Sequence, residues 1–274
     1  MWLDAIYHAL DPIAFSLGPF AVRWYGLAYF AGFMCAGTAI YRVSRRWGLG
    51  LEMDDVINVM VAVALGVILG GRLGYVLFYG GGYFLANPLK VLAINEGGMS
   101  FHGGLVGALV AGGIACRVLG LSLPTICDLA AIGAPLGLFF GRCANFVNGE
   151  LWGKQADVPW AVMFSETGGG MVYRHPSQLY EALLEGLLLF VILFALSRRR
   201  PAWPQGTFLG SFLALYGCFR FLIEFVRLPD PQLGYLLGTT WLTMGQCLSL
   251  PLVLAGLGLL SWARVMRRDQ RAFA

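Results

Sequence analysis

Seven long apolar stretches constrain this chain more than any other feature of its sequence. They lie at about residues 20–41, 55–79, 100–119, 125–143, 179–197, 207–226 and 241–262. Each matches the ~20 residues that an α-helix needs to cross the hydrocarbon core of a bilayer. Hydrophobic residues make up 58% of the chain and charged residues only 12%, which excludes an ordinary soluble domain. The sequence therefore predicts an all-α integral membrane protein with seven transmembrane helices.

The basic residues predict the orientation of the chain in the membrane. Short cytoplasmic loops collect Lys and Arg, and the first, third, fifth and seventh stretches are followed by Arg42, Arg45, Arg46, Arg117, Arg198, Arg199, Arg200, Arg264, Arg267, Arg268 and Arg271. With seven spans these positions share one side, so we expect an external N-terminus and a cytoplasmic C-terminus. Residues 1–19 lack the basic start and cleavage pattern of a removable signal peptide, so the first span is predicted to be an uncleaved anchor.

A second set of arginines falls where this orientation rule gives no reason for it. Inside the apolar stretches, or near their predicted external ends, lie Arg23, Arg72, Arg142, Arg174, Arg220 and Arg227. A single arginine of this kind is explained by snorkelling or by a buried ion pair. Six of them near one membrane face favour a site for an anion. Phosphate suits the planar guanidinium group, which donates two parallel hydrogen bonds.

Two segments bring several polar groups to membrane depth, where such groups are costly unless paired or functional. Residues 142–150 (Arg-Cys-Ala-Asn-Phe-Val-Asn-Gly-Glu) end the fourth stretch. In the sixth stretch Tyr216, Arg220 and Glu224 are spaced four apart, and Arg227 follows three later. This spacing stacks their side chains along one helix face. Arg220 and Glu224 can pair within the helix, so a purely structural salt bridge stays an alternative to a shared site.

A single histidine, His102, lies among glycines at the start of the third stretch, in Gly97-Gly98-Met99-Ser100-Phe101-His102-Gly103-Gly104. Histidine exchanges protons near neutral pH, and the glycines would let a substrate approach the backbone closely. Two interpretations stay open, a catalytic or ligand-binding histidine and a structural hydrogen-bond donor.

The other small residues predict packing and not chemistry. Gly70 with Gly74, and Gly133 with Gly137 and Gly141, recur at four-residue spacing, which lets membrane helices pack closely. The six cysteines lie in apolar segments without a Cys-x-x-Cys pair, and the three histidines are widely spread. No metal site, phosphate loop or dinucleotide fingerprint is predicted.

Two segments outside the spans are predicted to lie on the external side. Residues 144–178 are too polar to cross the membrane and are expected to form a small cap, with Ser177 capping the helix that follows. Residues 80–99 are rich in glycine and aromatic residues, which suits an arm at the membrane interface. Nothing in the sequence indicates a second folded unit, so residues 1–274 are expected to form a single membrane domain.

Taken together, these elements resemble the prolipoprotein diacylglyceryl transferases of bacteria. The resemblance rests mainly on the segment Gly141-Arg142-Cys143-Ala144-Asn145-Phe146-Val147-Asn148-Gly149-Glu150-Leu151-Trp152-Gly153, which fits the family signature throughout. Similar elements occur around it in family order: Arg23-Trp24-Tyr25-Gly26, Gly71-Arg72-Leu73-Gly74-Tyr75, His102-Gly103-Gly104, His175-Pro176-Ser177-Gln178-Leu179-Tyr180-Glu181 and residues 216–227. They span nearly the whole chain.

The resemblance implies a reaction that composition alone does not. The diacylglyceryl group of phosphatidylglycerol would move to the thiol of a lipobox cysteine in a preprolipoprotein, forming a thioether and releasing glycerol phosphate. It also implies a multi-pass protein of the bacterial cytoplasmic (inner) membrane, with seven spans and the active site toward the external face. No cofactor or metal is required by this chemistry.

The chemistry and the resemblance together predict residue roles. A thiol with a pKa of about 8.5 needs a base near neutral pH, and His102 is the candidate, with Tyr216 able to share or relay the proton. Arg142 and Arg220 are expected to stabilise the departing phosphate. The predicted substrate-binding residues are Tyr25, Arg72, Asn145, Asn148, Glu150, Gly153, Glu224 and Arg227.

Two other classes of function stay open on the residues alone. A transporter or lipid flippase could also use intramembrane arginines to bind an anion, and a noncatalytic receptor could bind anionic lipid without releasing a product. Glycine interruptions that do not repeat between two halves argue against the first of these. Covalent product formation separates both from a transferase.

Overall fold

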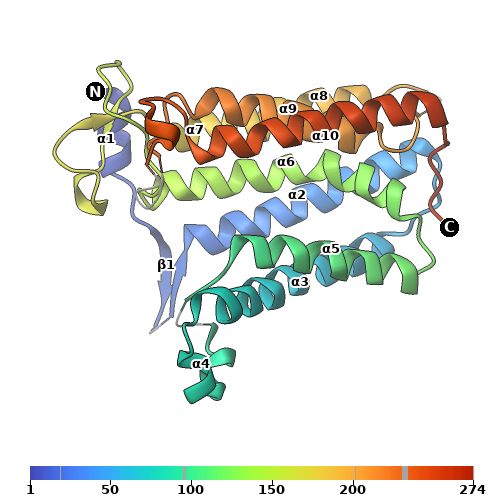
Figure 1. Ribbon diagram of the computed structural model, residues 1–274, viewed down its shortest axis with the longest axis horizontal. Coiled ribbons are helices and arrows are strands. Elements are labelled where there is room, and N and C mark those ends of the chain that lie inside the picture. Colours follow the sequence, from blue (N-terminus) through green and yellow to red (C-terminus); the bar gives the residue numbers. More distant parts are fainter. Residues whose placement is uncertain (19, 95–96, 201, 230–233, 274) are drawn as a thin grey trace. The chain divides into compact units, whose positions relative to one another are not determined.

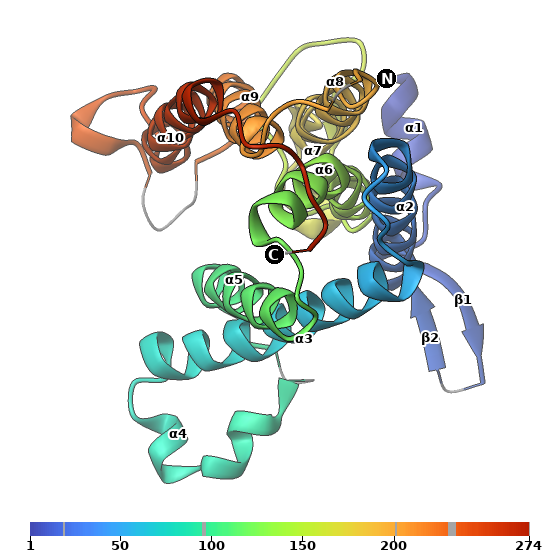
Figure 2. The same ribbon diagram turned by 90° about the vertical axis from the view of Figure 1, so that its right-hand side faces the viewer.

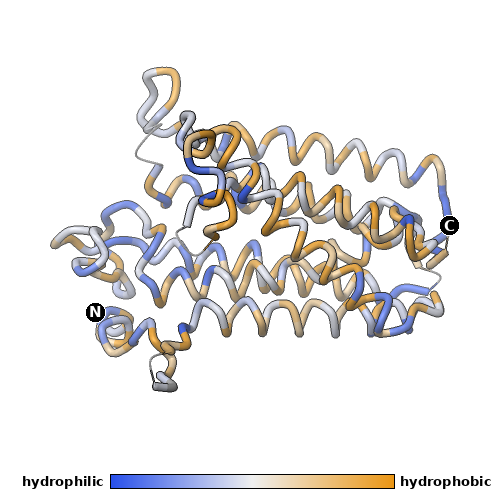
Figure 3. Tube along the Cα trace, turned by 90° about the horizontal axis from the view of Figure 1, so that it is seen from below, coloured by the Kyte–Doolittle hydropathy of each residue, from blue (hydrophilic) through white to orange (hydrophobic). Residues whose placement is uncertain are grey.

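The computed structural model describes residues 1–18, 20–94, 97–200, 202–229 and 234–273, and it is mostly helical (Figure 1). The chain forms two compact units, one of Met1–Trp47 with Cys127–Gln270 and the other of Gly48–Ile126 with Arg271–Ala274. Apolar residues run along the helices, whereas many polar residues lie at helix ends and in loops (Figure 3). Each unit is described in turn below.

The first unit carries most of the helices. Its elements are α1 (Trp2–His8), β1 (Ile13–Leu17), β2 (Phe20–Arg23), α2 (Trp24–Trp47), α6 (Leu123–Val147, whose first turn belongs to the other unit), β3 (Val162–Met163), η3 (Ser165–Thr167), β4 (Tyr173–Arg174), α7 (Ser177–Glu181), the π-helix η4 (Ala182–Leu188), α8 (Leu189–Leu196), α9 (Thr207–Ile223), η5 (Leu236–Gly238) and α10 (Met244–Met266). Strands β1 and β2 pair antiparallel, as do β3 and β4. Helices α9 and α10 pack side by side (Figure 2).

The second unit contains α3 (Met53–Tyr79), α4 (Tyr83–Ala86), the 3₁₀ helix η1 (Pro88–Leu92) and α5 (Phe101–Val118). Helices α3 and α5 lie against each other through glycines. A Cβ at Gly70 would collide with the backbone of Gly103 and Gly107, and a Cβ at Gly74 would lie 2.9 Å from the Cα of Gly103. The close packing predicted for Gly70 and Gly74 is confirmed.

The glycines of α6 behave as predicted only in part. A Cβ at Gly133 would lie 3.0 Å from Ile40 of α2, and one at Gly32 of α2 would lie 3.2 Å from the Cα of Gly137. Close packing of α2 on α6 therefore uses Gly133 and Gly137. A Cβ at Gly141 would meet nothing within 4 Å among the described residues, so the series does not extend to it.

Five helical segments are long and apolar enough to cross a membrane among the described residues: Met53–Tyr79, Phe101–Val118, Leu123–Val147, Ser177–Leu196 and Met244–Met266. They match five of the seven predicted spans closely. Helix α9 is apolar but has 17 residues, and α2 has 24 residues without reaching the same apolar character over its length. The remaining two spans stay predictions.

The segment predicted as a cap packs around a small apolar cluster at the end of α6. The cluster contains buried Tyr7 of α1, Phe146 of α6 and Phe164, with Trp152 and Leu179 packed against it. Gly149 has a φ of +67°, and a Cβ there would collide with Tyr7 and Thr167. Because glycine tolerates this conformation and leaves this space, α1 can approach the loop.

The predicted cap by Ser177 is wrong in detail. Ser177 is the first residue of α7, after the N-cap Pro176, and its hydroxyl donates to the carbonyl oxygen of Leu151 at 2.9 Å. The serine therefore fastens the loop after α6 to the start of α7. The predicted interfacial arm, residues 80–99, contains α4 and η1, and its residues 95–96 lie outside the described residues.

Candidate active site

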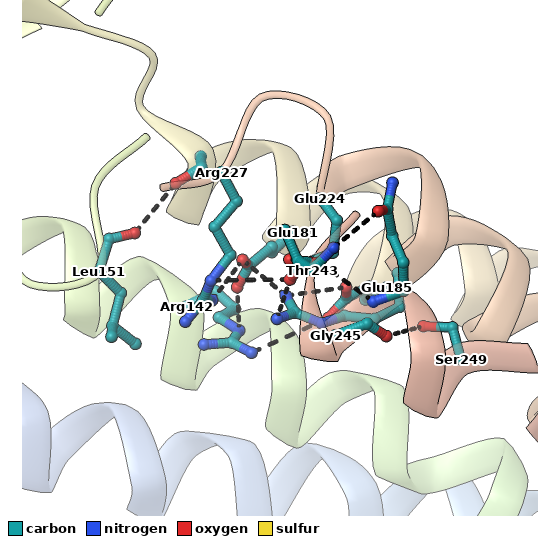
Figure 4. A network of polar contacts seen from close by, with 12 residues as sticks. Arg142, Leu151, Glu181, Glu185, Glu224, Arg227, Thr243, Gly245 and Ser249 are labelled. Atoms are coloured by element: carbon teal, nitrogen blue, oxygen red, sulfur yellow. Dashed lines mark hydrogen bonds and ion pairs between the residues drawn. The ribbon is translucent and has the colours of Figure 1, made fainter. Parts of the chain in front are cut away.

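Three arginines from two helices and the segment after α9 converge on one buried glutamate in the first unit. Glu181, at the end of α7, is 0% exposed. Its carboxylate oxygens lie 2.6 Å from Arg142 Nε, 3.0 Å from Arg220 Nη1 and 2.8 Å from Arg227 Nη1 (Figure 4). A buried carboxylate is strongly destabilising unless it is paired, so Glu181 holds all three guanidinium groups at one point.

Two further glutamates complete the cluster. Glu224 pairs with Arg220 one turn away, as the sequence spacing predicted, and its Oε1 lies 3.8 Å from Arg227 Nε. Glu185 is 0% exposed, and its oxygens lie 3.9 Å from Arg220 and 4.0 Å from Arg142. These distances are too long for hydrogen bonds, and neither oxygen has a hydrogen-bond partner among the described residues. The formal charges of the three arginines and three glutamates cancel.

Glu181 and Glu185 point to the same place because they are four residues apart on one continuous helical segment, at the junction of α7 with the π-helix η4. π-helical turns occur often at functional sites. A Cβ at Gly186 would lie 2.7 Å from the Cα of Phe139, so this glycine lets the π-helix approach α6, which carries Arg142. No role for Glu181 or Glu185 was predicted from the sequence. Their position within or beside an apolar stretch, where a carboxylate is costly, is the sequence feature that could have identified them.

The start of α10 fixes Glu224 from the other side. Thr243 is the N-cap of α10, and its hydroxyl donates to Glu224 Oε2 at 2.6 Å while accepting from the backbone N–H of Gln246 at 3.2 Å. A Cβ at Gly245 would lie 2.5 Å from the carboxyl carbon of Glu224. Gly245 therefore leaves the space that the carboxylate occupies, and Thr243 orients it toward Arg220.

The end of α6 supplies a second polar group of residues. Asn145, which is buried, donates to Glu150 Oε2 at 3.3 Å, and Asn148 donates to Glu150 Oε1 at 3.1 Å. The structure thus brings together the two carboxamides and the carboxylate that the sequence predicted to share a site. Gln178 of α7 donates to the backbone oxygen of Glu150, which ties this loop to the helix that carries Glu181.

Gly153 connects the loop after α6 with the segment that carries Arg227. Its N–H donates to the carbonyl oxygen of His175 at 2.9 Å, and it forms an antiparallel bridge with Arg227. A Cβ at this position would lie 2.6 Å from the carbonyl oxygen of Val226. The geometry gives Gly153 a positioning role, because any larger residue would push the backbone of Arg227 away.

The two tyrosines predicted for the site lie on α2 and α9. The Tyr25 hydroxyl lies 3.2 Å from the hydroxyl of Tyr29. Tyr216 precedes Arg220 by one helical turn and stacks on Phe212, with ring centroids 5.7 Å apart. Tyr216 therefore shares the face of α9 that carries Arg220, as predicted.

A histidine of the cap lies beside the start of α7. His175 Nδ1 is 3.1 Å from the Tyr180 hydroxyl, which also accepts a 2.7 Å hydrogen bond from Trp160 Nε1. Burial lowers the pKa of His175 below its ordinary value, so the neutral ring is favoured. The structure gives this motif a role in holding the start of α7.

The remaining predicted site residues, His102 and Arg72, belong to the second unit. His102 is the second residue of α5 and is exposed, with its ring edge-on to Phe101. The helix start is capped by Ser100, whose hydroxyl accepts from the N–H of Gly103 at 3.2 Å. Gly103 itself packs against α3, so the glycine beside the histidine serves helix contact. The predicted approach of a substrate to this backbone stays a prediction.

Arg72 fastens the arm to α3. It is 5% exposed, and its guanidinium group donates to the carbonyl oxygens of Val91 at 2.8 Å and Gly97 at 2.5 Å, and also to those of Lys90 and Gly98. Its guanidinium carbon also lies 5.3 Å from the ring centre of Phe84. These contacts explain a buried arginine in α3 without a lipid.

Comparison with known proteins identifies the family of this chain. The family described as prolipoprotein diacylglyceryl transferase matches residues 12–262. The chain is 52% identical over 248 residues to a phosphatidylglycerol–prolipoprotein diacylglyceryl transferase of Geobacter sulfurreducens, covering 90% of this chain and 93% of the relative. It is 51% identical over 260 residues to the enzyme of that name from Solidesulfovibrio magneticus, covering 93% and 96%. The chain belongs to the prolipoprotein diacylglyceryl transferase family.

Proposed function

We propose that this chain transfers the diacylglyceryl group of phosphatidylglycerol to the lipobox cysteine thiol of prolipoproteins. The names of its relatives, phosphatidylglycerol–prolipoprotein diacylglyceryl transferases, support the two substrates and the group transferred. The observation that carries the site assignment is the convergence of Arg142, Arg220 and Arg227 on one carboxylate between membrane helices. A phosphate-bearing lipid headgroup is the anion that such a cluster accommodates in a bilayer.

In the proposed reaction the cysteine sulfur attacks the glyceryl carbon that carries the phosphate ester. A carbon–sulfur bond forms, the carbon–oxygen bond breaks, and glycerol phosphate leaves with the electron pair. The thiol proton goes to a base, for which His102 is proposed, with Tyr216 sharing or relaying the proton. Because the thiol is largely protonated near neutral pH, this proton transfer is required for a useful rate.

The cluster of arginines is proposed to stabilise the charge that develops on the phosphate. Arg142 and Arg220 would act on the departing oxygen, each contact contributing on the order of 3 kcal/mol in a site shielded from water. Each guanidinium group has five N–H donors, so one that contacts Glu181 can also donate to phosphate. Glu181 and Glu224 are positioning residues in this proposal, since they hold the arginines and do not touch the reacting atoms.

The other residues of the first unit are proposed to bind or orient the headgroup. They are Tyr25, Asn145, Asn148, Glu150, Gly153 and Arg227. Two of them, Asn145 and Asn148, already share a hydrogen-bonded carboxylate, which supports a common role. Arg72 is proposed only to hold the arm that flanks lipid access, because its contacts to four backbone carbonyls support that role.

The proposed setting is the bacterial inner membrane, crossed seven times by the five helical segments described above together with α2 and α9. Arg142 lies near the end of α6, Glu181 near the start of the span Ser177–Leu196 and Arg220 near the end of α9. These positions share one end of alternating helices, which is the external face if the eleven arginines at the other ends of the spans, Arg42 to Arg46, Arg117, Arg198 to Arg200 and Arg264 to Arg271, are cytoplasmic.

The test is to incubate the purified protein with phosphatidylglycerol and a lipobox peptide. We expect the peptide to gain the mass of a diacylglyceryl group and glycerol phosphate to appear in equal amount. A peptide with serine in place of the cysteine is the matched control. Lipid binding without either product would overturn the proposal in favour of a receptor or a transporter.

A further inference from the structure

A cavity of about 750 Å³ lies at the end of the first unit opposite the arginine–glutamate cluster. Its lining comes from the last residue of α8, Leu196, the loop between α8 and α9, the start of α9 and the end of α10. Glu181 precedes Leu196 by 15 residues of continuous helix, which places the two about 20 Å apart at ~1.5 Å per residue. The cavity has the size typical of ligand sites and is separate from the proposed active site.

The lining of this cavity combines cationic and apolar groups. Arg199, Arg264 and Arg267 contribute three guanidinium groups and Asp269 one carboxylate, which leaves a formal surplus of two positive charges. The hydroxyl residues Thr207 and Ser211 line it from one face of α9, and Leu196 and Leu260 add apolar walls. Guanidinium and hydroxyl groups suit a phosphate, and the leucines suit the apolar body attached to it.

A buried aspartate makes the walls of the cavity rigid. Asp128 of α6 is 0% exposed and accepts from the N–H groups of Gly206 at 2.9 Å and Leu209 at 2.8 Å, and from Gln270 Nε2 at 2.6 Å. Gln270 also donates to the carbonyl oxygen of Trp203 at 3.1 Å. The α8–α9 loop and the segment after α10 are therefore fixed to each other. A preorganised site loses less entropy when a ligand binds.

The arginines are also held in place. The Arg199 guanidinium carbon lies 3.8 Å from the ring centre of Trp203. Arg267 is the C-cap of α10 and has a φ of +45°, the left-handed conformation in which helices commonly end. Its Nε donates to the carbonyl oxygen of Arg264 at 3.3 Å, so the chain turns back and keeps both arginines beside the cavity.

We propose that this cavity binds the phosphate headgroup of an anionic phospholipid from the leaflet at this end of the helices. That leaflet is the cytoplasmic one if the predicted orientation holds, and basic pockets between helices on that side suit anionic lipid headgroups. The site is a second lipid site, distinct from the one proposed for the transferred lipid. Binding of a lipid in this cavity does not depend on the proposed transfer reaction.

The test uses the full chain in phosphatidylcholine nanodiscs that contain phosphatidic acid with a photoactivatable acyl chain. After illumination, we expect the lipid to be attached to peptides from residues 196–211 and 257–269, and photoactivatable phosphatidylcholine to label them much less. The triple variant R199Q/R264Q/R267Q should reduce this labelling on the order of tenfold or more. The variant R42Q/R45Q/R117Q removes equal charge from exposed residues outside the cavity and should keep it.

Other outcomes would overturn the proposal. Equal loss of labelling in both triple variants would mean that only a diffuse positive field attracts the lipid. Loss of labelling on addition of inorganic phosphate, at a concentration that leaves control peptides unchanged, would assign the cavity to a soluble phosphate. The single variant Arg264→Glu, at an exposed position, repeats the test with little risk to folding and should likewise lose the labelling.

Discussion

Glu181 is the single side chain on which the arginine cluster depends most. Its carboxylate contacts Arg142, Arg220 and Arg227 and is fully buried. Glu181→Gln keeps the size but leaves three guanidinium groups short of a counter-charge. Breaking a buried ion pair in this way typically costs about 3–5 kcal/mol, so we expect a large fall in thermal stability and loss of diacylglyceryl transfer.

Glu166→Gln is the matched control for this prediction, because the Glu166 side chain in the cap is 81% exposed. It should leave both the unfolding temperature and the transfer rate nearly unchanged. Equal effects of the two variants would show that Glu181 does not organise the cluster.

Gly245 tests whether the position of Glu224 matters. The Cβ of Gly245→Ala would collide with the Glu224 carboxylate and push it from Thr243 and Arg220. We expect the free energy of unfolding to fall by about 1–3 kcal/mol, which is typical of an overpacked site. We also expect the transfer rate to fall at temperatures where the variant is still folded. Gly258→Ala in the same helix meets nothing within 4 Å and should be neutral or slightly stabilising. Similar behaviour of the two variants would contradict this account.

Among the helices, α3 and α5 form a pair whose contact depends on glycine. A Cβ at Gly70 would meet backbone atoms of Gly103 and Gly107, which cannot move aside cheaply. Gly70→Ala should therefore separate the helices and lower the unfolding temperature measured in detergent, at a cost of about 1–3 kcal/mol. Gly113→Ala in α5, where a Cβ meets nothing within 4 Å, is the control. A stabilised Gly70→Ala variant would refute the close packing.

Arg72 of α3 makes the hydrogen bonds described above to the arm, and their contribution can be measured by proteolysis. Arg72→Lys keeps the positive charge but loses the fork that donates to several carbonyl oxygens. We expect faster cleavage between residues 80 and 98, with the rest of the chain protected as before. Arg117→Lys, an exposed position at the end of α5, should cleave like the parent chain, and an unchanged arm in Arg72→Lys would disprove the role.

The helices and part of the site could be predicted because their signals are local. An apolar stretch identifies a span, and Arg142, Arg220 and Arg227 were found because arginines are costly in such stretches. Glu185 was missed, since the arginines nearest to its carboxylate, Arg142 and Arg220, lie on other helices. Partners that are backbone carbonyls, like those of Arg72, carry no signal in the sequence. Such long-range contacts decide which polar residue is structural and which belongs to a site.

For the chain as a whole, the predicted orientation has the widest consequences, because it decides which leaflet each lipid site faces. In the predicted orientation with seven spans, the loops after residues 47, 119, 200 and 266 would be cytoplasmic, and those around residues 80–99, 144–178 and 227–243 would be external. Fusions of a reporter enzyme that is active only outside the cytoplasm should be active after residues 98, 150 and 229 and inactive after residues 47, 119 and 200.

This experiment also tests the two spans that length and composition alone leave open. If α2 did not cross the membrane, a fusion after residue 47 would report the same side as one before α2. If α9 did not cross, fusions after residues 200 and 229 would agree with each other. The second result would place Arg142 and Arg220 at opposite faces of the bilayer, and a shared phosphate site would be impossible. The first would invert the predicted side of both arginines and leave them on one face, because α2 precedes them both in the chain. Opposite reporter activity after residues 200 and 229 is therefore a necessary condition for the proposed reaction.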